Sequence, residues 1–172
     1  MVAPGVSCPF LVNVKRAILF TVIFLTGVVV MSVFGMLTTF SGMNAYLATG
    51  ISYLTGVLVV GVGLLIFSFL TKYHDLNEIK LGNVAVGLAM GGLILGLSNI
   101  MRFAILSNNT LTGILIWGGV GIVGMIAGWL LFEILTPQFR VDEELSKDNR
   151  AVGIMVLAVF IAISYIVGAS IS

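Results

Sequence analysis

Residues 83–106 read NVAVGLAMGGLILGLSNIMRFAIL, a run whose length and apolar character indicate the class of fold. It is apolar on every face of a helix and holds one charged residue, Arg102. A helix of roughly 20 residues crosses a hydrocarbon core about 30 Å thick, so the stretch is long enough to span a membrane. Strands of a membrane barrel would instead alternate apolar and polar residues over about ten positions. The sequence therefore predicts a transmembrane helix here.

Four further stretches have the same length and character. The five predicted spans cover residues 17–40, 47–70, 83–106, 111–135 and 151–171. We expect an all-α membrane protein with five transmembrane helices, the last four forming two parallel-repeat hairpins. Residues 1–46 then hold the first helix, residues 47–106 the first hairpin and residues 107–172 the second. A signal peptide is the alternative for the first span, but the apolar run exceeds the roughly 7–15 residues of such a signal.

The composition of the whole chain agrees with a lipid environment. Of its 172 residues, 59% are hydrophobic and 9% are charged, and the mean hydropathy is +1.20. A water-soluble domain carries roughly 25% charged residues, so that class is excluded. The net charge of +1 provides no basic surface for nucleic acid. Cys8 is the only cysteine, which excludes an intrachain disulfide and a multi-cysteine metal site.

The distribution of lysine and arginine predicts the orientation, because cytoplasmic loops keep an excess of both. Lys15 and Arg16 precede the first span, and Arg102 alone lies toward the opposite side. The other basic residues then share the side of the N-terminus: Lys72, Lys80, Arg140, Lys147 and Arg150. We expect a prokaryotic cytoplasmic membrane, with the N-terminus in the cytoplasm and the C-terminus outside.

A sequence motif occurs twice at one constant offset. The first copy runs from Glu78-Ile79 to Asn83-x-Ala85-Val86-Gly87, and the second from Glu144-Leu145 to Asn149-x-Ala151-Val152-Gly153. The same register pairs Ser98 with Ser164, and Thr71 pairs with Thr136 if one residue is inserted. Both hairpins have the same sense, so we expect a parallel repeat about a pseudo-two-fold axis along the membrane normal.

Asn83 and Asn149 begin the two matching helices. One interpretation is helix capping, in which the side-chain oxygen accepts the first N–H groups of the helix. The other is a pair of polar groups that meet at the pseudo-axis on the cytoplasmic rim of the membrane.

These residues carry a family resemblance. The two motif copies, with Trp117-Gly118-Gly119 between them, resemble a family of uncharacterised bacterial inner-membrane proteins that includes YjfL. The resemblance covers residues 47–171 and implies four helices in two hairpins, with no known activity. Some members resemble components of envelope-stress gene neighbourhoods. The additional first span departs from this pattern, so a family interface does not transfer directly.

Few residues offer chemistry within the predicted spans. His74 is the only histidine and lies in a loop, where a solvated role is expected. Ionisable groups inside a span are candidate functional residues, and Arg102 and Glu133 are the two here. Arg102 is expected to extend to the outer headgroups or to line a polar pocket with Asn99. Glu133 is expected to reach the opposite interface or to pair with Arg140 or Lys147.

No cofactor is expected, and a metal site is disfavoured. The run Asp142-Glu143-Glu144 holds three carboxylates, but consecutive residues do not converge on one helical face. An enzyme is also not expected, because one histidine and one cysteine cannot supply a nucleophile, a base and an orienting group.

Small residues recur at four-residue spacing, which permits close helix packing in lipid. The pairs are Ser52 with Gly56, Gly87 with Gly91, Gly92 with Gly96, Gly124 with Gly128, and Ala158 with Ala162. They fit packing within the hairpins or association with a partner. The leading functional hypothesis is a structural or accessory subunit that binds itself or another integral membrane protein. The alternative is a small channel or transporter lined by Ser98, Asn99, Ser164 and Tyr165.

Overall fold

The computed structural model describes residue 40 and residues 42–71, 75–136 and 140–171. The predicted first span, Cys8 and His74 lie outside these residues. The helices of the described part are α2 (Ala45–Leu70), α3 (Asp75–Lys80), α4 (Val84–Ser107), α5 (Leu111–Leu135), α6 (Val141–Ser146) and α7 (Arg150–Ile171). Within that part, α2, α4, α5 and α7 are long and apolar enough to cross a membrane. They coincide with the last four predicted spans.

Local side-chain hydrogen bonds define several helix ends. Asn44 accepts the N–H of Tyr46 at the start of α2, and Thr110 accepts the N–H of Gly113 at the start of α5. At the other ends, Thr71 and Thr136 adopt non-helical backbone angles, and their N–H groups donate to the carbonyls of Phe67 and Phe132. Such bonds satisfy backbone groups that the helix leaves open at its ends.

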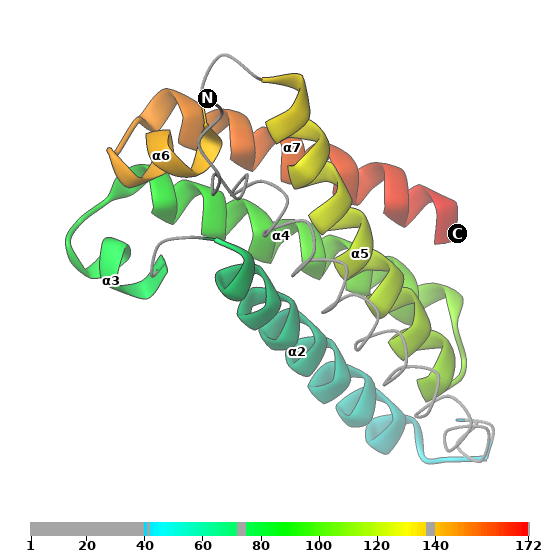
Figure 1. Ribbon diagram of the computed structural model, residues 1–172. Coiled ribbons are helices and arrows are strands. Elements are labelled where there is room, and N and C mark those ends of the chain that lie inside the picture. Colours follow the sequence, from blue (N-terminus) through cyan, green and yellow to red (C-terminus); the bar gives the residue numbers. More distant parts are fainter. Residues whose placement is uncertain (1–39, 41, 72–74, 137–139, 172) are drawn as a thin grey trace, which may run out of the picture.

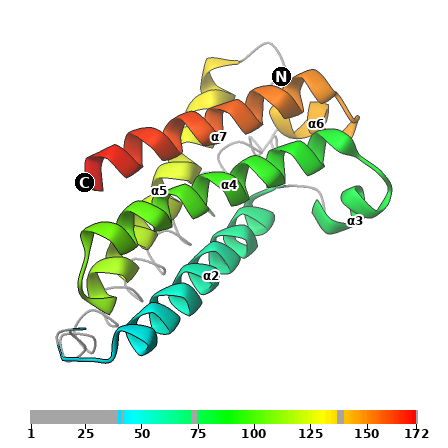
Figure 2. The ribbon, with the colours of Figure 1, turned by 180° about the vertical axis from the view of Figure 1, so that it is seen from behind.

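The long helices form two hairpins of the same sense (Figure 1). α4 and α7 lie side by side and run in the same direction, and α5 packs across both. α2 packs against α4 and α5. The view from behind in Figure 2 shows α3 and α6 at one end of the bundle. We call this end, where α2 and α5 finish and α4 and α7 begin, the short-helix end.

An aromatic cluster lies in the core between the two hairpins. The ring of Phe67 on α2 meets the ring of Trp129 on α5 and the ring of Phe160 on α7 edge to face. The ring centroids lie 5.7 and 5.4 Å apart, which is a favourable geometry for aromatic pairs. All three side chains are fully buried. Because lipid tails are as apolar as these side chains, close packing rather than exclusion from water holds them together.

Glycines bring the backbones of α4 and α7 into direct contact. A methyl group added to Gly153 would lie 2.8 Å from the Cα and carbonyl oxygen of Ala85. One added to Gly92 would lie 2.7 Å from the Cα of Leu157. These helices therefore approach more closely than any side chain at the two glycines would permit.

Other predicted small residues divide into packed and open positions. Side chains from neighbouring helices lie against Gly56, Gly96, Gly124 and Gly128. By contrast, nothing in the described residues lies within 4 Å of a methyl group added to Gly87 or Gly91. The small residues thus serve packing within the chain at most positions, whereas no described residue covers the stripe of α4 that holds Gly87 and Gly91.

The predicted two-fold relation between the repeats is wrong for the contact of α4 with α7. In a two-fold interface, every contact occurs twice with the roles of the two residues exchanged. The repeat counterpart of the contact of Gly153 with Ala85 is a contact of Gly87 with Ala151. Gly153 lies against Ala85, whereas Gly87 has no such neighbour among the described residues. The two helices therefore present different faces to each other.

Candidate functional site

The turns that precede α4 and α7 have matching geometry. The backbone N–H of Asn83 donates to the carbonyl of Glu78, and that of Asn149 to the carbonyl of Glu144, each at 3.0 Å. The side-chain amides donate to the carboxylates of the same two glutamates at 3.1 and 2.8 Å. A glutamate and an asparagine at this spacing therefore form the same hydrogen-bonded turn in both repeats.

A left-handed residue precedes each asparagine. Gly82 has a φ of 87° and Asp148 a φ of 57°. Glycine adopts this region without strain, and aspartate is among the few other residues that tolerate it. The two residues occupy the same position of the repeat, but only Asp148 has a carboxylate.

Hydrogen bonds join the start of α4 to the second turn, and the described residues contain no matching bonds between the start of α7 and the first turn. Asn83 Nδ2 donates to the carbonyl of Leu145 at 2.9 Å, and its Oδ1 caps α4 by accepting the N–H of Val86 at 3.0 Å. Asp148 Oδ1 accepts the N–H of Ala85 at 2.9 Å. The second turn thus completes the N-terminus of α4, where a negative charge is favourable. Capping is the role of Asn83, and its contact across the bundle is to a backbone carbonyl rather than to Asn149.

Short ion pairs surround the second turn. Lys147 Nζ lies 3.0 Å from Glu144 Oε1, Arg150 Nε lies 3.4 Å from Asp148 Oδ2, and Arg140 lies 2.8 Å from Glu143. These pairs are largely exposed, and such pairs contribute little to stability. Arg140 and Lys147 were the expected partners of Glu133, but these contacts place them on Glu143 and Glu144.

Two carboxylates of the second turn are held in their charged form. The N–H of Ala85 lowers the pKa of Asp148, with Arg150 contributing less. The amide of Asn149, followed by Lys147, lowers the pKa of Glu144. Hydrogen bonds to the ionised form are thus the main cause in both cases.

Stability is expected to fall in acid because of this arrangement. A carboxyl group whose pKa is lower in the folded state stabilises the fold above its unfolded pKa, about 3.9 for aspartate. That contribution disappears as the pH falls through the folded pKa. The thermal midpoint in detergent should therefore hold between pH 7 and 5 and decline below about pH 4.

The change Asp148→Asn tests the source of this decline. The variant should have a lower midpoint than the wild type at pH 7, and the difference should shrink as the pH approaches 2. A difference that stays constant over this range would exclude the charge of Asp148 as its cause.

Within the helices, two of the predicted polar residues meet. Asn99 Nδ2 on α4 donates to Ser164 Oγ on α7 at 3.2 Å, and the Ser164 hydroxyl donates to the carbonyl of Ile161 at 2.7 Å. Ser164 is 1% exposed, whereas Tyr165 is 61% exposed. The structure therefore joins Asn99 with Ser164 but turns Tyr165 outward.

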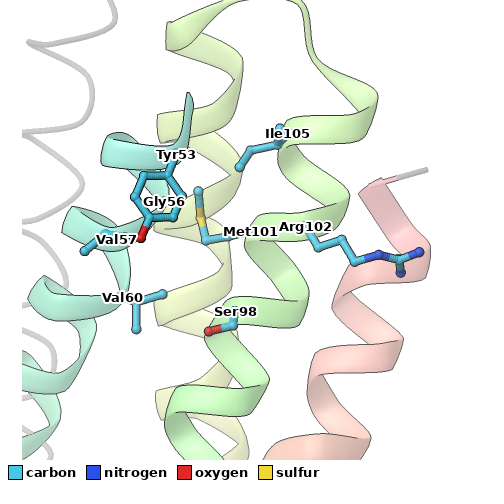
Figure 3. A pocket seen from close by; sticks show the side chains of 8 residues that line it. All are labelled: Tyr53, Gly56, Val57, Val60, Ser98, Met101, Arg102 and Ile105. Carbon is cyan, nitrogen blue, oxygen red and sulfur yellow. The ribbon is translucent and has the colours of Figure 1, made fainter. Parts of the chain in front are cut away.

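Ser98 and Arg102 line a separate pocket of about 320 Å³ between α2 and α4 (Figure 3). Tyr53, Gly56 and Met101 also line it, and most of its surface is apolar. The guanidinium of Arg102 extends away from Tyr53, and its Cζ lies 5.3 Å from the ring centroid of Phe103. Arg102 is exposed, consistent with a side chain that extends toward headgroups.

The predicted site residues thus fall into three places. The motif residues gather at the short-helix end, and they include Thr71, Glu78, Asn83, Ala85, Thr136, Glu144, Asn149, Ala151 and Gly153. Asn99 and Ser164 meet between α4 and α7, while Ser98 and Arg102 face the α2 side. Glu133 lies on the last turn of α5, three residues before Thr136, and so also at the short-helix end. Among the residues that the structure describes, no three His, Cys, Asp or Glu side chains form a metal-binding group.

Sequence reasoning missed the role of Asp148. In the sequence it is one acidic residue between Lys147 and Asn149 with no assigned role, yet it caps the helix of the other hairpin. Its alignment with Gly82 is the signal that points to it, because a position shared by glycine and aspartate suggests a left-handed turn.

Comparison with known proteins now identifies the class. Residues 40–171 match the family described as Domain of Unknown Function (DUF350), so the chain belongs to this family and is a multi-pass membrane protein. It is 38% identical over 119 residues to the UPF0719 transmembrane protein YshE of Bacillus subtilis (strain 168). That alignment covers 69% of this chain and 89% of YshE. No solved structure matches. The expected membrane family of unknown function is confirmed, but these matches do not name YjfL.

Proposed function

We propose that the chain is a structural or accessory subunit of the cytoplasmic membrane that works by associating with other membrane helices. The uncovered stripe on α4 carries this proposal. No described residue lies within 4 Å of a methyl group added to Gly87 or Gly91, although glycine in a helix costs about 0.5–1 kcal/mol relative to alanine. Close approach of another helix is the usual reason for such a stripe in lipid.

The two hairpins form a duplicated unit in this proposal, with an additional N-terminal span. The matching turns at Asn83 and Asn149 support the duplication. The basic residues near the short-helix end support its placement in the cytoplasm, with the C-terminus of α7 outside.

Mass measurement after gentle extraction from native membranes tests association. We expect particles heavier than one chain with its lipid, either a homo-oligomer or an assembly with another integral membrane protein. The same extraction in a harsh detergent serves as the monomer reference. A lone chain in the mild detergent would contradict the proposal.

A channel or transporter is the second candidate, and the buried Asn99–Ser164 pair favours it. Polar groups that bond inside a membrane bundle are candidates for a path or binding site. Against it, the two side chains are bonded to each other, and the α2–α4 pocket is mostly apolar. Proteoliposomes with no flux above empty vesicles would exclude this candidate.

A further inference from the structure

The sequence repeat gives α4 and α7 two corresponding faces, and within the chain the two helices pack on each other through only one face each. We name each face after one of its residues and use that name for the corresponding face of the other helix. The Ala85 face of α4 comprises Ala85, Gly92, Gly96, Asn99 and Phe103, with repeat counterparts Ala151, Ala158, Ala162, Tyr165 and Ala169 on α7. The Gly153 face of α7 comprises Gly153, Leu157, Phe160, Ser164 and Gly168, with counterparts Gly87, Gly91, Ile94, Ser98 and Arg102 on α4.

Inside the chain, the Ala85 face of α4 packs on the Gly153 face of α7. Gly153 lies against Ala85, and Gly92 lies against Leu157. Farther along, the Asn99 amide bonds to Ser164. Near the far end, Gly168 leaves room for the ring of Phe103. The contact therefore extends along the helices, and every part of it joins unlike faces.

No other described helix packs along the remaining two faces. On the Gly153 face of α4, no described residue lies within 4 Å of a methyl group added to Gly87 or Gly91, Ile94 is 41% exposed, and Ser98 is exposed beside the α2–α4 pocket. On the Ala85 face of α7, Ala151, Ala158, Ala162 and Tyr165 are exposed. Each chain thus has one open face of each kind, on different helices.

We propose that a second copy of this chain docks the Gly153 face of its α4 on the Ala85 face of α7, repeating between chains the contact that exists within the chain. This deepens the proposed function by naming the partner and rests on it. Because the two faces in this contact differ, the contact is heterologous. Heterologous contacts build rings or open filaments rather than two-fold dimers.

The side chains at the proposed contact are compatible with it. The counterparts place Ala151 beside Gly87 and Ala158 beside Gly91, both combinations of small residues. The hydroxyls of Tyr165 and Ser98 take the place of the Asn99–Ser164 bond. Within the chain, Gly168 of α7 makes room for Phe103 of α4. In the contact between chains, the corresponding residues Arg102 of α4 and Ala169 of α7 face each other.

The turns at the short-helix end support the same arrangement. Asn83 Nδ2 bonds to its own Glu78 and also to the Leu145 carbonyl of the other hairpin. Asn149 bonds to its own Glu144, and the described residues contain no counterpart of the second bond. In the proposed contact, that counterpart is the Ile79 carbonyl of the neighbouring copy.

Disulfide formation in membranes tests the head-to-tail geometry. In a Cys8→Ser background, a chain carrying both Gly87→Cys and Ala151→Cys should form a ladder of covalent oligomers after oxidation. Chains carrying only one of the two cysteines should not link to themselves, because a heterologous contact never brings identical residues together. Mixing two differently tagged single variants should give only the mixed dimer.

A matched pair controls for random collision. Leu65 on α2 is 61% exposed, so Leu65→Cys combined with Ala151→Cys tests another surface in the same half of the membrane. This pair should link far less than the first. Equal linking of both pairs, or dimers from Ala151→Cys alone, would overturn the proposal.

Filling the open stripe provides a second measurement. Gly91→Leu and Ala158→Leu should each reduce the particle to the mass of one chain, because leucine separates the backbones. The monomer should still fold, since Gly91 has free space and Ala158 is exposed. Gly50→Leu on α2, also with free space, should leave the oligomer intact.

The outcomes separate this inference from the proposed function. A native assembly with another membrane protein, without the predicted disulfides, would leave the subunit function standing and overturn the head-to-tail contact. A wild-type protein that is a lone chain in membranes and in mild detergent would overturn both.

Discussion

Gly153→Ala is expected to lower the stability of the bundle by about 3 kcal/mol, the upper part of the usual range for overpacking. The added methyl group would lie 2.8 Å from the Cα and the carbonyl oxygen of Ala85. Both are backbone atoms, so no side-chain rotation relieves the contact and the two helices must separate. For a protein of this size, the thermal midpoint in detergent should fall by roughly 6–12 °C.

Gly61→Ala is the matched control for this change. Gly61 lies in α2, and no described residue lies within 4 Å of the added methyl group. Removing a helical glycine there should raise stability by about 0.5–1 kcal/mol. If both variants shifted the midpoint equally, helix propensity would explain the result and the close α4–α7 contact would not.

Asn83→Ala is expected to cost about 2–3 kcal/mol, and Asn149→Ala about half as much. Asn83 caps α4, which contributes about 1 kcal/mol. It also donates to Glu78 and to the Leu145 carbonyl, and each lost bond adds about 1 kcal/mol. Within the chain, the Asn149 side chain donates only to Glu144 among the described residues.

Thermal unfolding of both variants, in a detergent that yields single chains, checks this order. Asn83→Asp provides an intermediate case, because it keeps an acceptor for the N–H of Val86 and loses the two donors. A loss for Asn149→Ala equal to that for Asn83→Ala would show that the link between the two turns contributes nothing.

The spans were predictable from sequence, and the relative placement of the helices was not. Lipid demands long apolar segments, and the segments containing Gly92 and Phe160 satisfy that demand without ambiguity. The same demand makes each helix apolar on all sides, so its pattern does not distinguish a buried face from a lipid face. Sequence similarity of the repeats suggested a symmetric pair, whereas the space around Gly153 and Gly87 shows unlike faces in contact.

At the short-helix end, the sequence indicated the residues but not their partners. The paired motifs identified Asn83 and Asn149, and capping was among their predicted roles. A backbone carbonyl such as that of Leu145 carries no sequence signal, so the link from Asn83 to it was not predictable. Likewise, Ser98 and Ser164 match in sequence, yet one lines a pocket and the other lies buried in a helix contact.

The order of synthesis delays the hydrogen bonds between the two turns. The partners of Asn83 and Ala85 lie 62 and 63 residues farther along the chain. When α4 first enters the membrane, its N-terminal end therefore has Asn83 and water but neither the Leu145 carbonyl nor the Asp148 carboxylate. The ribosome must complete α5 and α6 before the first hairpin acquires its final bonds, so the turn before α7 fixes a helix that was made earlier.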